Sequence, residues 1–167
     1  MFAWHFVNED RKLGYGDDRI VKQGRVYIVP QTRPLELCEY GLHASKRILD
    51  ALQYAPGPVL CRVELRGKML HDNDKSVAYE RKVLWMMDAT DVLRAFARRC
   101  ALDVVHLWSP PEIVIQYLKT GDESIRAAAR NAAWAAARNA ARAAAWDAER
   151  KKQNARLTSM AMATRRK

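Results

Sequence analysis

The chain has 167 residues, a formal net charge of +10 and three cysteines. This length suffices for one domain with a hydrophobic core plus an appendage. The cysteines lie far apart and form no CxxC pair, which excludes a disulfide-stabilised scaffold and fits a reducing cytoplasm. Met1–Lys12 lacks the apolar centre of a signal peptide, and no apolar run reaches the roughly 18 residues of a membrane span, so we expect neither.

Residues 1–88 are predicted to form a small antiparallel sheet with one packed helix, an α+β domain. The clearest predicted strand is Val59–Leu65, whose odd-numbered residues are all apolar and share one face. Further strands are predicted at residues 3–7, 20–21, 25–29, 35–40 and 77–87, with a hairpin or loop at 9–18. A helix is predicted over residues 46–54, with Ser45 as its N-cap residue.

Two connecting helices are predicted over residues 89–121. The first follows Asp88 or Thr90, either of which can cap it, and continues through Leu102 with apolar residues at helical spacing. The second begins at Ser109–Glu112, where the serine, the prolines and the glutamate form a capping box, and it ends at Gly121.

A long helix is predicted over residues 122–153, capped by Asp122, and a basic frayed tail over residues 154–167. Between Arg126 and Arg150, 14 of 25 residues are alanine, the best helix former. Every fourth position in this stretch is large: Arg126, Arg130, Trp134, Arg138, Arg142, Trp146 and Arg150. Because four residues turn a helix by about 400°, these side chains wind around it as a slow spiral and do not share one face.

The basic charge is concentrated in this helix and tail. From Gly121 onward, eleven lysines and arginines stand against four acidic residues, a net charge of +7, whereas the first 120 residues carry only +3. This asymmetry indicates an acidic partner, which can be nucleic acid, an acidic protein surface or anionic lipid, and the seven large residues of the spiral are the predicted contacts. The spiral disfavours reading of a DNA sequence from a single face.

Two other interpretations of the helix remain open. In one, it is a solvated, solubilising appendage. In the other, it is a packing element: either Trp134 and Trp146 dock it onto the body of the chain, or its alanine faces pack against a second copy and give a homo-oligomer.

Motifs for enzymatic chemistry are sparse. No zinc spacing, phosphate loop or nucleophile elbow occurs, so no metal site and no resident cofactor are expected. One alternative remains, because His43, Tyr54 and Glu80 are the residue types with which ADP-ribosyltransferases hold NAD and orient a ribose hydroxyl. In the competing structural interpretation His43 caps a turn, Tyr54 packs in the core and Glu80 pairs with Arg81 or Lys82.

Several short motifs together resemble a family of phage and prophage proteins that have a GLHAS-type α+β domain and a tail of Ala-Ala-Arg and Ala-Ala-Trp units. These motifs are Trp4–Phe6, Tyr15–Asp17, Cys38, Gly41–Ser45, Tyr54–Gly57, Cys61–Val63, Asp74–Ala78 and Leu84–Met86.

This resemblance assigns no chemistry to any residue. It implies a phage accessory protein acting in the cytoplasm of a bacterial host. Small phage proteins of this kind often inhibit host defence, including CRISPR systems, by occluding a nucleoprotein surface. We therefore expect a binding protein, with an anti-CRISPR role among its possible forms, and not an enzyme.

Overall fold

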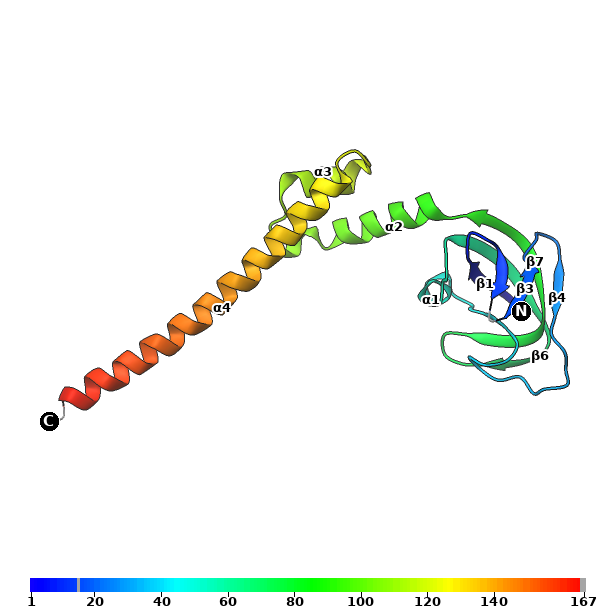
Figure 1. Ribbon diagram of the computed structural model, residues 1–167, viewed down its shortest axis with the longest axis horizontal. Helices are drawn as coiled ribbons and strands as arrows, with labels where there is room; N and C mark the ends of the chain where they lie inside the picture. Colours follow the sequence, from blue (N-terminus) through cyan, green and yellow to red (C-terminus); the bar gives the residue numbers. More distant parts are fainter. Residues whose placement is uncertain (15, 166–167) are drawn as a thin grey trace. The chain divides into compact units, whose positions relative to one another are not determined.

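The computed structural model describes the backbone of residues 1–14 and 16–165, together with all their side chains except those of 147–151 and 154–165. The chain forms two compact units, Met1–Arg94 and Ala95–Lys167, which are described separately below. The first unit contains every strand and one short helix, and the second is helical, so the predicted α+β class is confirmed (Figure 1).

Two long antiparallel strands form the centre of the first unit. β6 (Val59–His71) and β7 (Ser76–Asp88) pair along most of their length. Their register shifts twice: β7 has an extra residue, Leu84, opposite the step from Arg62 to Val63, and β6 has a bulge between Arg66 and Met69. β1 (Phe2–Val7) pairs with the far edge of β6, and β4 (Val26–Ile28) pairs with β7. Bulges bend a strand and increase its twist, and β6 and β7 curve around the core (Figure 1).

β5 (Leu42–Ala44) joins the two edges of this sheet. It pairs with β7, and the next residue, Ser45, exchanges backbone hydrogen bonds of 2.8 and 2.9 Å with Trp4 on β1. The strands β1, β6, β7 and β5 therefore form a closed ring of backbone pairing. A small hairpin of β2 (Lys12–Gly14) and β3 (Asp17–Ile20) forms a separate two-stranded sheet.

The alternation predicted for β6 is confirmed. Val59, Cys61, Val63 and Leu65 are all buried in the main core, whereas Leu60 joins a second cluster. In that cluster Leu60 packs with Phe6 of β1 and Ala51 of α1 (Ile48–Gln53). The even-numbered face of β1 thus faces the helix, and its odd-numbered residues Ala3 and Val7 face the main core.

Several local predictions for the first unit were wrong. The predicted strand at 35–40 is a turn held by one backbone bridge between Glu36 and Tyr40. Residues 25–29 do not pair with 20–21, because β4 pairs with β7 instead. Ser45 does not cap α1, since its backbone is bonded to Trp4 and the N-cap residue is Arg47. Gly67 does not end the strand but lies within the bulge of β6, with a φ of 71°.

The second unit contains most of α2 (Thr90–Asp103), a 3-10 turn η1 (Val105–Leu107), α3 (Glu112–Thr120) and α4 (Arg126–Arg165). Asp88 accepts a hydrogen bond from the Thr90 backbone N–H at 2.8 Å, in agreement with the predicted start of α2. Gly121 ends α3 in the left-handed conformation, as predicted. The expected Ser109 capping box does not form, because the N-cap residue is Pro111.

The long helix differs from its prediction at both ends. Asp122 holds a turn through Ser124 and does not cap α4, which begins at Arg126. At the other end, helix continues to Arg165, through most of the segment that we expected to be frayed. Among the described residues, no helix combines the length and the apolar character that crossing a membrane requires.

Candidate functional sites

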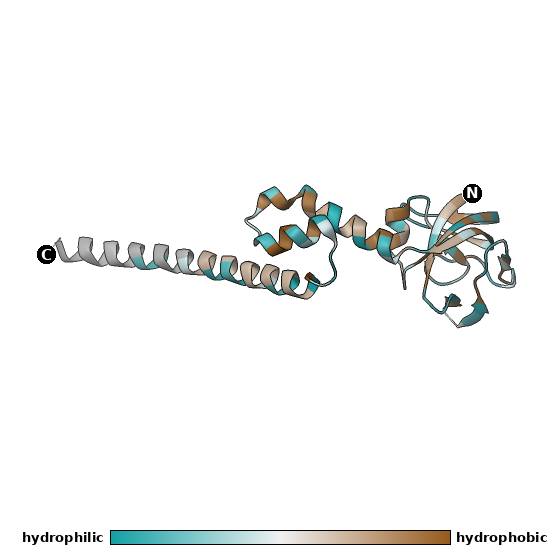
Figure 2. Cartoon of the chain, turned by 90° about the horizontal axis from the view of Figure 1, so that it is seen from above, coloured by the Kyte–Doolittle hydropathy of each residue, from teal (hydrophilic) through white to brown (hydrophobic). Residues whose placement is uncertain are grey.

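Among the side chains that the structure describes, those of helix α4 are buried only near its beginning. α4 contacts α3, and Ala129 of α4 and Val114 of α3 are both buried, Ala129 to 3% exposure. Farther along, every side chain from Ala137 to Trp146 is exposed. This segment carries Arg138, Arg142 and Trp146 among alanines, and Figure 2 shows polar and weakly apolar residues alternating along it.

The arginines of this helix differ in their pairing. Arg126 bonds Glu123 at 3.2 Å. Arg130, Arg138 and Arg142 are exposed and form no ion pair with any described residue. Arg150 falls outside the described side chains. Three guanidinium groups on α4 are thus available to an external anion.

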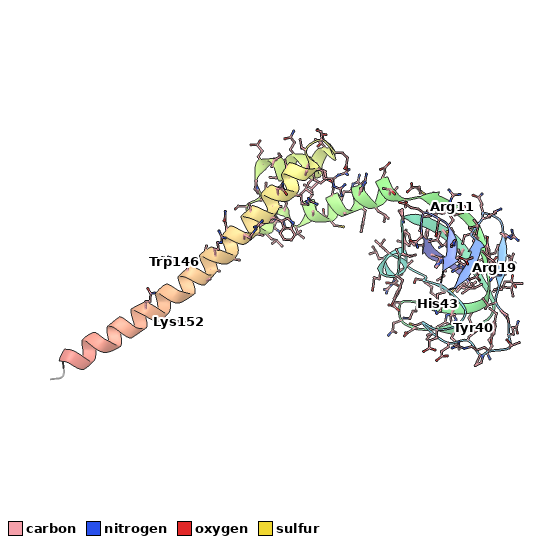
Figure 3. The ribbon with its side chains drawn as sticks, in the orientation of Figure 1. Arg11, Arg19, Tyr40, His43, Trp146 and Lys152 are labelled. Carbon is pink, nitrogen blue, oxygen red and sulfur yellow. The ribbon has the colours of Figure 1, made fainter. Side chains whose placement is uncertain are left out.

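The two predicted tryptophans of α4 are exposed as well. Trp134 is 65% exposed and Trp146 is 68% exposed, and Figure 3 shows Trp146 and Lys152 projecting from the helix. Indole rings with this exposure are available for stacking on a base or for a protein contact.

A cavity of about 500 Å³ lies in the first unit, between β1, the turn before β5, α1 and the turn before β7. Its volume is in the range of small-molecule sites. Two residues of the predicted NAD-binding set, His43 and Tyr54, line this cavity. The third, Glu80, is not among the lining residues, and its carboxylate bonds Arg66 Nη1 at 3.2 Å.

His43 has a well-defined role in the cavity wall. Its Nε2 accepts a hydrogen bond from the Cys38 backbone N–H at 3.0 Å, so the ring fixes the turn that carries Cys38. Burial lowers the pKa of His43, although a hydrogen bond with the Gly41 backbone opposes this shift. A neutral imidazole is the form that can accept from an N–H group. This position agrees with the expectation that His43 caps a turn. Figure 3 labels His43 and, nearby along the chain, Tyr40.

A polar network lies at one end of the cavity. Lys75 Nζ donates to Cys38 Sγ at 2.8 Å and to Tyr54 Oη at 3.5 Å, and it lies 4.8 Å from the centroid of the Tyr54 ring. Tyr54 Oη in turn donates to Asp74 Oδ2 at 2.5 Å. The Cys38 hydrogen bond is the main reason that the pKa of Lys75 is raised. The Tyr54 side chain is 49% exposed and does not pack in the core.

A buried arginine lies behind the cavity wall. Arg81 is 2% exposed, and its Nη1 donates to the His43 carbonyl oxygen at 2.7 Å. Its Nε has no hydrogen-bond partner among the described residues, and no carboxylate pairs with it. Burial lowers the pKa of Arg81 to about 10. On the cavity wall, burial and then the Arg81 charge lower the pKa of His5 well below its usual value.

The two remaining thiols have different surroundings. Cys61 is fully buried, and burial raises its pKa to about 11, while Cys100 is exposed on α2. Within the part of the chain that the structure describes, no three histidine, cysteine or acidic side chains gather closely enough to hold a metal ion.

The comparison with protein families bears on the first unit. Residues 1–95 match a family described as a domain of unknown function, DUF7666. The chain belongs to the DUF7666 family. The match ends one residue after the boundary of the first compact unit, so the cavity lies wholly within the DUF7666 domain and the exposed part of α4 lies outside it. Neither the curated proteins nor the solved structures that were compared include a match.

Sequence reasoning missed Cys38 and Lys75 as lining residues of this cavity. They are 37 residues apart, and the pairing of β5 with β7 brings their segments together. One signal was present in the sequence, since Cys38 and His43 stand close together, but nothing in it connects this pair to Lys75.

Proposed function

We propose that this protein binds the phosphate backbone of nucleic acid through α4, without recognising a base sequence. The supporting observation is the set of three exposed arginines, Arg130, Arg138 and Arg142, that lack an acidic partner among the described residues. They belong to the segment from Gly121 onward, which has a net charge of +7. Arginine contacts to phosphates release counterions and supply sequence-independent affinity.

The spiral arrangement supports backbone binding over base readout. A recognition helix inserts one face into the major groove. The arginines of α4 are four or eight residues apart and drift around the helix, so they cannot all address one groove. They can reach phosphates of a strand that follows the helix, and Trp134 and Trp146 can stack on unpaired bases.

The test is the salt dependence of binding. Fluorescence anisotropy with labelled single-stranded and duplex oligonucleotides measures the dissociation constant of the full chain at several salt concentrations. We expect the triple substitution Arg130→Ala, Arg138→Ala and Arg142→Ala to weaken binding to oligonucleotides of unrelated sequence by similar factors. It lowers the slope of log K against log salt by about 3 for duplex DNA, since each lost phosphate contact contributes about 0.9.

A charge-matched control is available in the first unit. Lys22, Lys46 and Lys68 are exposed, and their combined replacement by alanine changes the net charge equally. This variant should bind like the unmodified chain. Equal losses in the two variants would mean that only total charge matters, and unchanged binding in the arginine variant would exclude α4 as the contact. Alanine preserves helicity, which circular dichroism verifies.

Occlusion of a host nucleoprotein complex, including inhibition of CRISPR defence, remains a prediction of the phage resemblance. Co-purification of the full chain from a bacterial host tests it, and a nucleic-acid-handling complex is the expected companion. The NAD-dependent alternative also remains a prediction. Transfer of label from NAD to host proteins that depends on Glu80 would support it.

A further inference from the structure

The cavity of the first unit contains a thiol in a setting that differs from those of the other two cysteines. Cys38 is exposed and lines the cavity together with Lys75 and Tyr54. Its backbone has a φ of 68°, in the left-handed region that non-glycine residues seldom adopt. The hydrogen bond from the Cys38 N–H to His43 Nε2 holds this conformation and presents Sγ to Lys75.

We propose that Cys38 is the reactive thiolate of a covalent site that takes small disulfides of the glutathione class into this cavity. This inference is independent of the nucleic-acid proposal, because it concerns a different unit of the chain and different residues.

The ammonium group of Lys75 lies against the thiol, with Nζ 2.8 Å from Cys38 Sγ. A cation next to a cysteine stabilises the thiolate, which is the nucleophile in all thiol chemistry. Lys75 is itself positioned by Tyr54, whose hydroxyl accepts from Nζ and donates to Asp74. Cys61 is fully buried, and no cation is bonded to Cys100 among the described contacts. Only Cys38 thus combines exposure with a bonded cation.

The same geometry favours thiol–disulfide exchange over acyl transfer. Acyl transfer forms an oxyanion that needs backbone N–H donors close to the nucleophile. The Cys38 N–H is already bonded to His43, and the next two N–H groups, of Glu39 and Tyr40, both donate to the Glu36 carbonyl oxygen. In disulfide exchange the negative charge stays on sulfur, so a thiolate and a nearby cation suffice.

The proposed step is a single displacement. The Cys38 thiolate attacks one sulfur of the small disulfide, the Cys38 S–S bond forms and the original S–S bond breaks. The leaving thiolate departs and takes a proton from solvent. Cys38 is oxidised to a mixed disulfide, and the other half of the small molecule is reduced to a thiol. Since Cys61 is fully buried, the first unit offers no exposed second thiol, and a free external thiol must reverse the step.

The experiment compares the cysteines within one full-length chain. The reduced protein is incubated with oxidised glutathione at pH 7, and peptide mapping by mass spectrometry follows adduct formation at each cysteine. We expect Cys38 to react about tenfold faster than Cys100, with a rate that saturates as the glutathione disulfide concentration rises. Cys100 should react more slowly and in linear proportion to that concentration.

Two lysine variants separate the cation effect from general charge. Lys75→Met should slow the reaction of Cys38 to the rate of Cys100. Lys68→Met, at an exposed position of β6, should leave the rate of Cys38 unchanged. Thermal unfolding followed by circular dichroism verifies that both variants are folded. Equal rates at Cys38 and Cys100 would overturn the proposal that Cys38 is the reactive cysteine. A Lys75→Met variant that reacts as fast as the unmodified chain would overturn the role of Lys75 in its reactivity. A strictly linear rate at Cys38 through the millimolar range would overturn binding in the cavity.

Discussion

Arg81 on β7 donates from Nη1 to the carbonyl oxygen of His43 on β5 at 2.7 Å, from a position that is only 2% exposed. The guanidinium therefore ties two strands of the ring together from inside the core. It does so without a carboxylate partner and with its Nε unbonded among the described residues.

Replacing this buried cation with an apolar side chain of similar length is expected to be tolerated. Arg81→Met loses one hydrogen bond but removes the desolvation of an unpaired charge, so the free energy of unfolding should stay equal or rise by about 1 kcal/mol. Arg81→Ala leaves a void and should lower it by about 3 kcal/mol. Urea unfolding of both variants measures the difference. A large loss of stability in the methionine variant would show that the guanidinium is required.

The stability of the first unit should decline below neutral pH. His5 and His43 have lowered pKa values in the folded chain, so the unfolded chain binds more protons below its histidine pKa of about 6.5. The contribution of these two histidines to the free energy of unfolding is therefore fully present above that pH. It is lost as the pH falls towards their pKa values in the folded chain. For His5 the slope is at most about 1.4 kcal/mol per pH unit, the value for one proton.

Melting temperatures measured between pH 8 and pH 5, a range of about three units around that pKa, test this expectation. His5→Gln should flatten the profile. A melting temperature that is constant across this range would contradict the argument.

Two glycines provide a matched pair for backbone and packing effects. Gly41 has a φ of 122°, and a Cβ there would lie within 2.8 Å of Leu35 and still closer to Val77. Gly24 has a φ of 79° but nothing within 4 Å. Gly24→Ala should cost about 1 kcal/mol from backbone strain alone, and Gly41→Ala about 3 kcal/mol, because a clash in the core is added. Equal losses of stability in the two variants would mean that the turn at Gly41 can shift enough to avoid the clash.

The chain should be monomeric in the absence of nucleic acid. Every described side chain of α4 beyond Ala136 is exposed, and polar residues interrupt the apolar ones along the part of the helix that Figure 2 colours. Arg138 and Arg142 on two copies would also repel each other. Sedimentation velocity at moderate salt provides the measurement. A dimer would instead favour the alternative in which α4 self-associates.

The sequence predicts some of these features because they are local. The alternation of β6 from Val59 to Leu65 requires only that one face is buried, and the glycine at 121 requires only a left-handed helix end. The strand expected at residues 35–40 fails because its apolar residues pack as a turn: Leu35 lies in a core cluster with Val77 and Tyr79. Ser45 has a residue type that often caps helices, but its backbone N–H and carbonyl instead form hydrogen bonds with Trp4 of β1.

The cavity illustrates what local patterns do not contain. The residue types of His43 and Tyr54 point to a shared site, and the two do line one cavity. Glu80 instead bonds Arg66, its direct cross-strand partner in the pairing of β6 with β7. The contact of Lys75 with Cys38 depends on the pairing of β5 with β7. No periodicity or capping rule encodes a contact that arises from strands so far apart in sequence.

The ring of paired strands also determines the order in which the first unit can fold during synthesis. Val7 pairs with Val59, and β5 needs β7, which ends at Asp88. β1 must therefore wait until most of the unit has been synthesised before its partner strand is available. Until then its apolar residues remain uncovered, among them Phe6 and Val7. The rate of translation through residues 59–88 therefore determines how long the nascent chain is exposed to aggregation.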